Sequence, residues 1–257
     1  MEITADFLRS IAAAAAAETL PRFRQRSEIV NKLERGFDPV TGADREAERA
    51  IRALINRQFP DHGILGEEFG GERLDAKHVW VIDPVDGTRA FISGLPTWGT
   101  LVGVLEDGDA VAGLMAQPFT GELYFADRNG SHYEGPGGRC ELAVSRVTEL
   151  KDATIFTTTP ALFQGDARRR YDALEAQVKL ARYGTDCYGF AMVAAGHAEI
   201  VVDPGLQPYD IVALIPIIER AGGIVTTFDG KPAETGGDII AAATPELHQA
   251  AMRLLAP

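Results

Sequence analysis

The chain has 257 residues, of which 46% are hydrophobic, so it can bury a substantial core as one large domain or two apposed ones, and disorder is not expected. Its formal net charge of -12 repels nucleic acid and anionic membranes, and no cluster of Lys and Arg offsets that charge, so neither is an expected partner. The two cysteines, Cys140 and Cys187, are too few and too far apart for a disulfide framework or a zinc site, which favours a cytoplasmic protein.

The first part of the chain predicts two helices. Thr4 can cap the first, which has an apolar face backed by a run of alanines. The acidic start and the short apolar stretch 11–17 fit neither a secretion signal nor a membrane span, which needs roughly 20 residues. A second helix is predicted after Thr41, with Asp44 at capping-box spacing and a polar face made of Arg45, Glu46, Glu48, Arg49 and Arg52.

Two strands in the next segment are predicted to end in carboxylates. Ile64–Glu68 reads ILGEE, a short apolar run followed by a glycine and two glutamates. The apolar run Val79–Ile82 ends at Asp83, and Asp86 follows three positions later in the segment WVIDPVDGT. Pro84 is expected to stop sheet pairing and to turn the chain, so that the side chain of Asp86 lies alongside that of Asp83.

Two carboxylates in one small space repel each other unless a divalent cation such as Mg²⁺ compensates their charge through oxygen ligands. Gly87 would let the backbone approach a ligand closely, and a helix beginning at Thr88 would turn its free N–H groups toward a phosphate. The alternative is an Asx-Pro turn with an Asp-Gly corner that binds nothing. Because the whole chain is acidic, an anionic phosphate substrate would itself need a local cation, which favours the metal site.

The hydrophobic pattern changes after this motif. Apolar runs within residues 99–133, separated by short turns, predict an antiparallel meander. The sequence GPGG at 135–138 is the predicted boundary. It divides the chain into residues 1–138, with an antiparallel sheet, and residues 139–257, an α/β region that completes the active site within one compact unit.

Beyond this boundary strands and helices alternate, so the predicted fold class is mixed α/β. Strands are predicted over Thr154–Thr157, Lys179–Tyr183, Ala198–Val202 and Ile239–Ala243, and helices over Cys187–Ala195 and Pro245–Leu255. A further helix is predicted over Asp210–Ala221, with a kink at Pro216, which lacks the N–H that a helix interior needs.

Four motifs occur in a fixed order: VTGAD ending at Asp44, ILGEE, WVIDPVDGT, and PYD ending at Asp210 before a helix that closes with AGG at Gly223. Taken singly, Asp44 and Asp210 could serve only as helix-dipole residues, worth about 0.3–1 kcal/mol each. Together the four motifs resemble the inositol monophosphatase superfamily. The resemblance implies a layered αβαβα fold, a Mg²⁺-dependent and usually lithium-inhibited phosphomonoesterase, and often a homodimer.

The resemblance also implies a role for each matching residue. Two or three Mg²⁺ ions would be held by Glu67, Asp83, the backbone carbonyl of Val85, Asp86 and Asp210. Asp44 and Thr88 would orient and deprotonate the attacking water with help from Glu67, while the backbone donors of Gly87 and Thr88 would hold the phosphate. Two cations roughly 3.5–4 Å apart can stabilise both the attacking and the leaving oxygen of an in-line displacement.

Three features depart from the inositol-type pattern: Tyr209 stands where Trp is usual, Arg89-Ala90-Phe91 follows DGT, and Asp186 stands where a small alanine is common. With GLQPYD and ALIPIIERAGG they resemble the bacterial histidinol-phosphate phosphatases of this superfamily. The expected reaction is therefore hydrolysis of L-histidinol phosphate to L-histidinol and phosphate, in histidine biosynthesis. Asp186 and Asp203 would face the cationic leaving group. Asp186 could instead cap the following helix, and Arg89 could touch phosphate or only cover the surface.

Other functions remain as alternatives. The first is an inositol-1-phosphate or broad sugar phosphate monophosphatase. A fructose-bisphosphatase-like activity would need a basic cluster for a second phosphate, which the sequence does not show. A non-catalytic regulator is disfavoured because every acid of the four motifs is intact. The sequence leaves open the number of metals at rest, lithium sensitivity and oligomer geometry.

Overall fold

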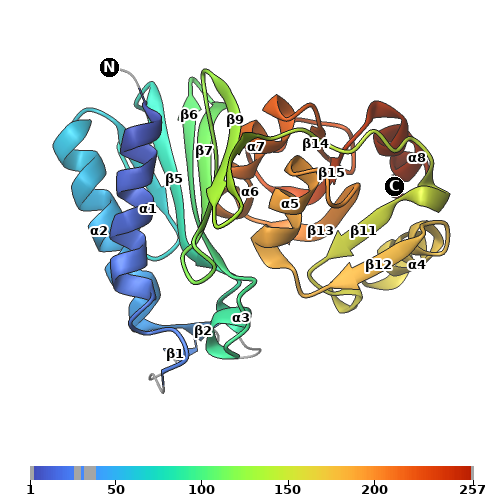
Figure 1. Cartoon of the computed structure of the whole chain (residues 1–257), viewed down its shortest axis with the longest axis horizontal. Helices are drawn as coiled ribbons and strands as arrows, with labels where there is room; N and C mark the ends of the chain where they lie inside the picture. Colours follow the sequence, from blue (N-terminus) through green and yellow to red (C-terminus); the bar gives the residue numbers. More distant parts are fainter. Residues whose placement is uncertain (1–2, 26–29, 32–38, 256–257) are drawn as a thin grey trace.

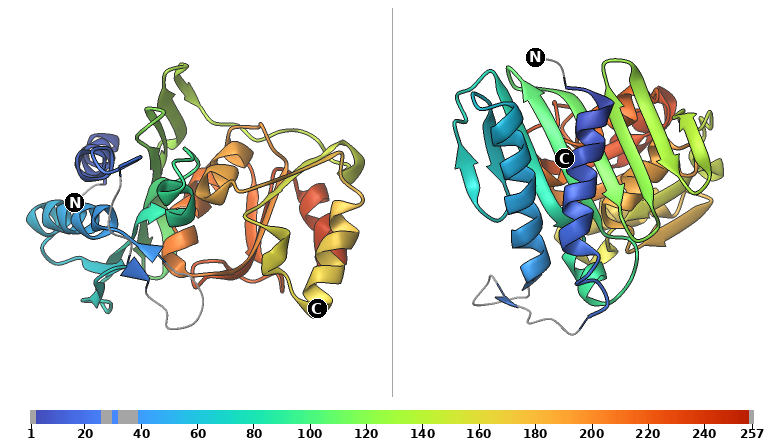
Figure 2. Two further views of the ribbon diagram at one scale, coloured as in Figure 1. Left: turned by 90° about the horizontal axis from the view of Figure 1, so that it is seen from below. Right: turned by 60° about the vertical axis from the view of Figure 1, so that its left-hand side comes forward.

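The computed structural model describes residues 3–25, 30–31 and 39–255. Its helices and sheets alternate in five layers, αβαβα, as expected (Figure 1). The first layer is a pair of packed helices, α1 (Ala5–Thr19) and α2 (Gly42–Gln58), which cover one face of the first sheet. The two views of Figure 2 show the same helix pair lying side by side on that sheet. The predicted fold class is confirmed.

The caps predicted for these two helices are present. The Thr4 side chain accepts a hydrogen bond from the backbone N–H of Phe7, so it caps α1. Thr41 and Asp44 form a reciprocal capping box at the start of α2. The cap fixes the first turn of α2, and with it the position of Asp44.

Within the described residues, the first sheet has eight strands in the order β10-β9-β8-β7-β6-β5-β3-β4. Their bounds are β3 Gly63–Gly66, β4 Gly70–Glu72, β5 His78–Asp86, β6 Gly99–Glu106, β7 Asp109–Gln117, β8 Glu122–Asp127, β9 Gly130–Gly135 and β10 Gly138–Glu141. The predicted meander is confirmed as β6 to β9. The GPGG sequence forms the turn between β9 and β10, so the first sheet continues to Glu141. The division of the chain at residues 138 and 139 stays a prediction.

The second sheet of the described chain has the order β12-β11-β13-β15-β14, with β11 parallel to both of its neighbours. Its strands are β11 Thr154–Thr157, β12 Leu180–Tyr183, β13 Ile200–Leu206, β14 Ile224–Thr227 and β15 Gly237–Ala242. A short two-stranded pairing joins β1 (Val30–Asn31) to β2 (Pro39–Val40). The other helices are α3 Thr88–Ile92, α4 Gly165–Glu175, α5 Asp186–Ala194, α6 Pro208–Ile211, α7 Leu214–Arg220 and α8 Pro245–Leu255, with 3-10 turns at Leu150–Asp152 and Pro160–Leu162.

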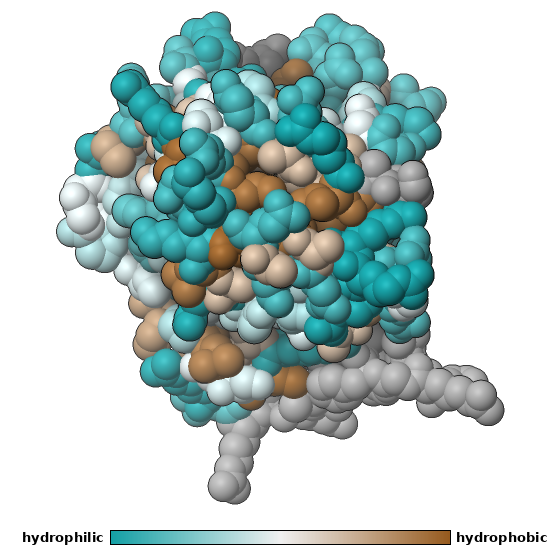
Figure 3. Space-filling view, turned by 90° about the vertical axis from the view of Figure 1, so that its right-hand side faces the viewer, coloured by the Kyte–Doolittle hydropathy of each residue, from teal (hydrophilic) through white to brown (hydrophobic). Residues whose placement is uncertain are grey.

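Hydrophobic cores lie between the layers. One joins α1 and α2 to the first sheet, a second joins α5 and α7 to both sheets, and a third joins α4 and α8 to the second sheet. Figure 3 views the end of the molecule that lies on the right in Figure 1, where hydrophilic residues surround a smaller apolar area. No helix in the described ranges has both the length and the apolar character that crossing a bilayer requires.

The helix predicted over Asp210–Ala221 is interrupted ahead of Pro216, as the expected kink implies, although Val212 and Ala213 keep helical backbone angles. It begins earlier, as α6, and resumes as α7 after Val212 and Ala213. Pro216 has no N–H to donate to the carbonyl of Val212, which is where an unbroken helix would have placed that bond. The break leaves α6 as a single short turn whose third residue is Asp210.

The break packs directly onto the first sheet at a pair of glycines. Gly103 and Gly113 are opposite each other on β6 and β7. A Cβ at Gly113 would lie 2.0 Å from the carbonyl oxygen of Ala213, and one at Gly103 would lie 2.7 Å from its amide nitrogen. Side chains at these two positions would therefore push the α6–α7 segment, and Asp210 with it, away from the sheet.

We expect Gly113→Ala to lower the free energy of unfolding by about 1–3 kcal/mol, because the new methyl group collides with backbone that cannot rotate away. The measurement is chemical denaturation. Gly42→Ala is the matched control, since a Cβ there meets no atom within 4 Å. Equal midpoints for the two variants would contradict the close approach.

Candidate metal centre and active site

Asp83 and Asp86 lie on the same face of β5 because the strand is irregular between them. Side chains three positions apart on a regular strand point to opposite faces. Here Asp83 pairs with Leu101 and Asp86 pairs with Gly99, so three steps along β5 match two along β6. This extra residue is a β-bulge. Sheet pairing is therefore interrupted at Pro84, as expected, but it resumes at Asp86 instead of ending.

Local hydrogen bonds hold the bulge in place. The carboxylate of Asp83 accepts from the backbone N–H of Val85 at 2.9 Å. The hydroxyl of Thr100, on β6, donates to the carbonyl of Pro84 at 2.8 Å. Pro84 has no N–H to leave unpaired, so it is well suited to an irregular position within a sheet.

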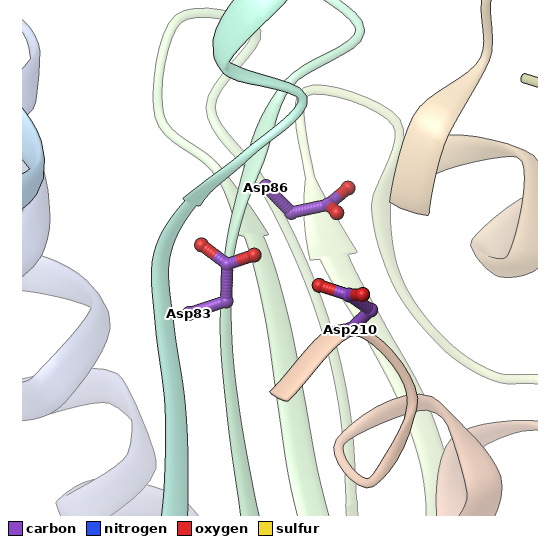
Figure 4. A group of neighbouring side chains, drawn as sticks. All are labelled: Asp83, Asp86 and Asp210. Atoms are coloured by element: carbon purple, nitrogen blue, oxygen red, sulfur yellow. The ribbon is translucent and has the colours of Figure 1, made fainter. Parts of the chain in front are cut away.

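Asp210 completes a group of three carboxylates. Oxygens of Asp83, Asp86 and Asp210 all lie within 4.8 Å of one another. Figure 4 shows the two β5 side chains and the α6 side chain pointing toward a common space. The strand end and the broken helix thus bring together residues more than 120 positions apart in the sequence.

The carboxylates strongly affect one another. Burial raises the pKa of Asp83 well above its usual value, and the charges of Glu67, Asp86 and Asp210 raise it further. Burial also raises the pKa of Asp86 well above normal, with added repulsion from Asp186 and Asp210. The pKa of Asp210 is raised to about 7, first by burial and then by Glu67 and Asp203, against a backbone hydrogen bond from Gln207.

These acids line a cavity of about 620 Å³ between the two sheets. Glu67 follows β3 and lines the same cavity, and its charge raises the pKa of both Asp83 and Asp210. The backbone N–H of Glu67 donates to the carbonyl of Ile82 at 3.1 Å, which ties the end of β3 to the end of β5. Two strand ends and one helix therefore converge, as the sequence predicts.

Asp44 and Thr88 meet at the edge of the cavity, which Thr88 lines while Asp44 is buried behind it. The hydroxyl of Thr88 lies 3.5 Å from Asp44 Oδ1 and donates to the carbonyl of Val85 at 3.1 Å. Asp44 Oδ2 accepts from the backbone N–H and the hydroxyl of Thr41, at 2.9 and 2.5 Å. Burial raises the pKa of Asp44 to about 6, although the Thr41 bonds act in the opposite direction.

Asp186 lies against Gly87 and also lines the cavity. Gly87 has φ 78° and precedes α3, as a residue without Cβ allows. A Cβ at Gly87 would lie 3.1 Å from the Asp186 carboxylate, so the two residues are in close contact. Asp186 itself has φ 44°, an uncommon backbone angle that Asp tolerates. Burial raises its pKa to about 6, opposed by the charge of Arg89.

Asp186 is the first residue of α5, and Thr185 rather than Asp186 occupies the cap position. The next residue links α5 to the carboxylate group, because the backbone N–H of Cys187 donates to Asp86 Oδ2 at 2.7 Å. No sequence pattern predicts this bond, which joins residues 101 positions apart.

Asp203, on β13, also lines the cavity but is 2% exposed. One of its oxygens accepts from the Thr157 hydroxyl and the Thr158 backbone N–H, at 2.8 and 2.7 Å, and the other accepts from the Thr158 hydroxyl at 3.1 Å. These bonds connect β13 to β11. Burial raises the pKa of Asp203 to about 6. Most of its hydrogen-bonding capacity is thus directed into the protein.

The donor set fits divalent metal ions. Among the described residues that line the cavity there are six carboxylate side chains and one basic side chain, Arg89. Hard divalent cations prefer carboxylate and carbonyl oxygens, and their charge would offset the burial and the mutual repulsion that raise these pKa values.

The layered fold and the carboxylates gathered at a strand end define a metal-dependent phosphatase architecture. The sequence model of the inositol monophosphatase family matches residues 2–256. The chain belongs to this family, whose members hydrolyse phosphoric monoesters in a metal-dependent way.

Individual relatives carry more than one name. The chain is 37% identical to the bifunctional phosphatase IMPL2 of Arabidopsis thaliana, over 91% of this chain and 69% of that protein. It is 37% identical to a histidinol-phosphatase of Chlorobaculum parvum, over 89% and 87%. The structure of an inositol monophosphatase from Zymomonas mobilis is 34% identical, has a TM-score of 0.86, and covers 97% of this chain with 96% of its own.

We expect the stabilisation by Mg²⁺ to increase with pH. The pKa of Asp210 is raised to about 7 in the folded protein, above the value of about 3.9 for an unfolded chain. The stability that this group contributes is present below the unfolded pKa and is lost as pH rises through about 7. The Tm of the metal-free protein should therefore fall over this range, and Mg²⁺ should restore it.

Thermal unfolding with EDTA or Mg²⁺, at about pH 5 and about pH 8, measures this effect. The Mg²⁺-induced rise in Tm should be larger at the higher pH, and Asp210→Asn should reduce the difference. A rise independent of pH would show that the carboxylate repulsion is not what Mg²⁺ relieves.

Proposed function

We propose that the protein hydrolyses L-histidinol phosphate to L-histidinol and phosphate with Mg²⁺ as the metal. The observation that carries the choice of substrate is Asp186, a carboxylate at the cavity wall next to Gly87 and outside the group of Asp83, Asp86 and Asp210. Histidinol phosphate carries an amine and an imidazole, whereas inositol phosphate offers neutral hydroxyls. The name of the Chlorobaculum relative supports the same choice.

In this proposal Glu67, Asp83, the carbonyl of Val85, Asp86 and Asp210 hold two or three Mg²⁺ ions. The carbonyl of Val85 accepts a hydrogen bond from Thr88 in the present arrangement, and it remains able to use its second lone pair. The ions would supply charge stabilisation to the attacking, leaving and equatorial oxygens of the phosphate.

The residues of this chain then position and activate the water. The Thr88 hydroxyl and the Asp44 carboxylate, 3.5 Å apart, orient it and take its proton, and Glu67 would help as a metal ligand. The Asp44 pKa of about 6 suits a group that must accept a proton near neutral pH. The backbone N–H groups of Gly87 and Thr88 face the phosphate.

The leaving group would lie toward Asp186. A cationic leaving group is favoured there because carboxylates outnumber basic side chains along the described cavity wall. Arg89 acts electrostatically on Asp186, so it orients that carboxylate or contacts the phosphate. Asp203 is the second acid toward the leaving group, with fewer free lone pairs because of its bonds to Thr157 and Thr158.

The alternative is an inositol-1-phosphate or broad sugar phosphate monophosphatase, which the name of the Zymomonas structure favours. We expect kcat/KM for histidinol phosphate to exceed that for inositol 1-phosphate by tenfold or more, which corresponds to about 1.4 kcal/mol. The measurement is phosphate release from both esters, with Mg²⁺ and with EDTA. A preference for the inositol ester of the same size would overturn our choice.

Asp186→Ala should lower kcat/KM on histidinol phosphate by about tenfold to a hundredfold, because a charge-assisted hydrogen bond to the leaving group is lost. Turnover of p-nitrophenyl phosphate, whose leaving group is not cationic, should change much less. Asp166→Ala, at an exposed aspartate on α4, is the matched control. Equal losses on both esters would count against a role for Asp186 in selecting the substrate.

A homodimer, a cytoplasmic compartment and the division of the chain at residue 138 also stay predictions.

A further inference from the structure

Glu48 is a fully buried carboxylate that the sequence places on the polar face of α2. The polar face predicted for α2 is therefore not solvent-exposed along its whole length, since Glu48 is 0% exposed. It lies four residues after Asp44, on the same side of the helix. A carboxylate removed from water in this way needs several strong hydrogen bonds.

Glu48 finds those bonds in the turn that carries Glu67. Its Oε2 accepts from the backbone N–H of Glu68 at 2.8 Å, and its Oε1 accepts from the backbone N–H of Phe69 at 3.3 Å. The two donors immediately follow Glu67. The carboxylate thus binds successive amides of the segment between β3 and β4.

Arg52 completes the contact, one helical turn further along α2. Its Nε donates to Glu48 Oε1 at 2.7 Å, which pairs the buried charge. Its other guanidinium nitrogens donate to the carbonyl of Gly70 and to Glu72 Oε1, the latter at 3.1 Å. Glu48 and Arg52 therefore hold both ends of the segment Glu68–Glu72.

Gly66, directly before Glu67, leaves room for this contact because it has no side chain. A Cβ at Gly66 would lie 1.9 Å from Glu48 Oε1 and 2.8 Å from Arg52 Nη2. The carboxylate of Glu48 thus occupies the space where any other residue at position 66 would place its side chain. The turn is fixed by steric fit as well as by hydrogen bonds.

We propose that Glu48 is a positioning residue that, together with Arg52, holds the turn after β3 so that the Glu67 carboxylate faces Asp83 and Asp210. This inference rests on the proposed role of Glu67 as a metal ligand. Neither Glu48 nor Arg52 lines the cavity between the sheets, so in this proposal they act through the backbone of the turn rather than by contact with metal or substrate. Partners that orient a ligand in this way affect metal affinity by roughly tenfold to a hundredfold.

Glu48→Gln tests the proposal. A glutamine at this position keeps the shape but has only one accepting oxygen, and its NH₂ group would face an N–H donor. We expect the Kd for Mg²⁺, measured by calorimetry without substrate, to rise roughly tenfold or more. At saturating Mg²⁺ the kcat should return to within about threefold of the wild-type value, because no catalytic group has been removed.

Glu46→Gln is the matched control, since Glu46 lies on the same helix but is only partly buried and pairs with Arg49 at the surface. It should leave the Kd for Mg²⁺ unchanged. If Glu48→Gln lowers only the Tm and leaves the Kd unchanged, its role is structural alone and the proposal is overturned. Should Glu48→Gln not fold, Arg52→Lys applies the same criterion, because lysine cannot make the three contacts of the guanidinium.

A double-mutant cycle with Glu67→Gln isolates the route of action. If Glu48 acts through Glu67, adding Glu48→Gln to Glu67→Gln should change the Kd for Mg²⁺ by less than about twofold. If the two substitutions instead raise the Kd independently, so that their fold-changes multiply, the proposal is overturned. The single variant Glu67→Gln tests the proposed metal site separately: if it does not weaken Mg²⁺ binding, that assignment fails and the inference fails with it. Substrate preference does not enter any of these measurements.

Discussion

The close approach of the α6–α7 break to β6 and β7 is the constraint on which the site depends. Gly103 and Gly113 let the backbone of Val212 and Ala213 lie on the sheet without intervening side chains. The single turn α6 is thereby held beside the end of β5, and Asp210 is forced into the neighbourhood of two other carboxylates. The tightly packed backbone thus holds Asp83, Asp86 and Asp210 together, although their negative charges repel one another.

The two kinds of residue in the cavity come from different elements of the fold. The carboxylates proposed for metal binding come from the ends of β3 and β5 and from α6, whereas Asp186 and Asp203 come from α5 and β13. The bond from the Cys187 amide to Asp86 connects these two halves. The proposed metal ligands and the acids proposed to face the leaving group thus come from different elements, and the relatives that share the fold carry different names.

Much of this arrangement could be predicted from the sequence, because the signals are local. The caps at Thr4 and Thr41, the meander and the helix disturbed by Pro216 all depend on neighbouring residues. The order of the motifs identified Asp83, Asp86 and Asp210, whose side chains converge. Glu48 was missed because its partners are backbone amides about 20 positions away, and a charged residue at helical spacing normally indicates a solvated face. The Cys187 amide carries no side-chain signal at all.

The bulge in β5 has a consequence for recognising such centres in other chains. Aspartates at even spacing share a face of any regular strand, so even spacing alone does not indicate that they bind a ligand. Two aspartates at odd spacing, as in Asp83 and Asp86, share a face only if one residue of their strand is left out of the hydrogen-bonded pairing with the next strand. A β-bulge of this kind disrupts the pairing locally, and bulges are over-represented next to active sites. An odd spacing between two such acids therefore indicates a bulged strand end at which a ligand can bind.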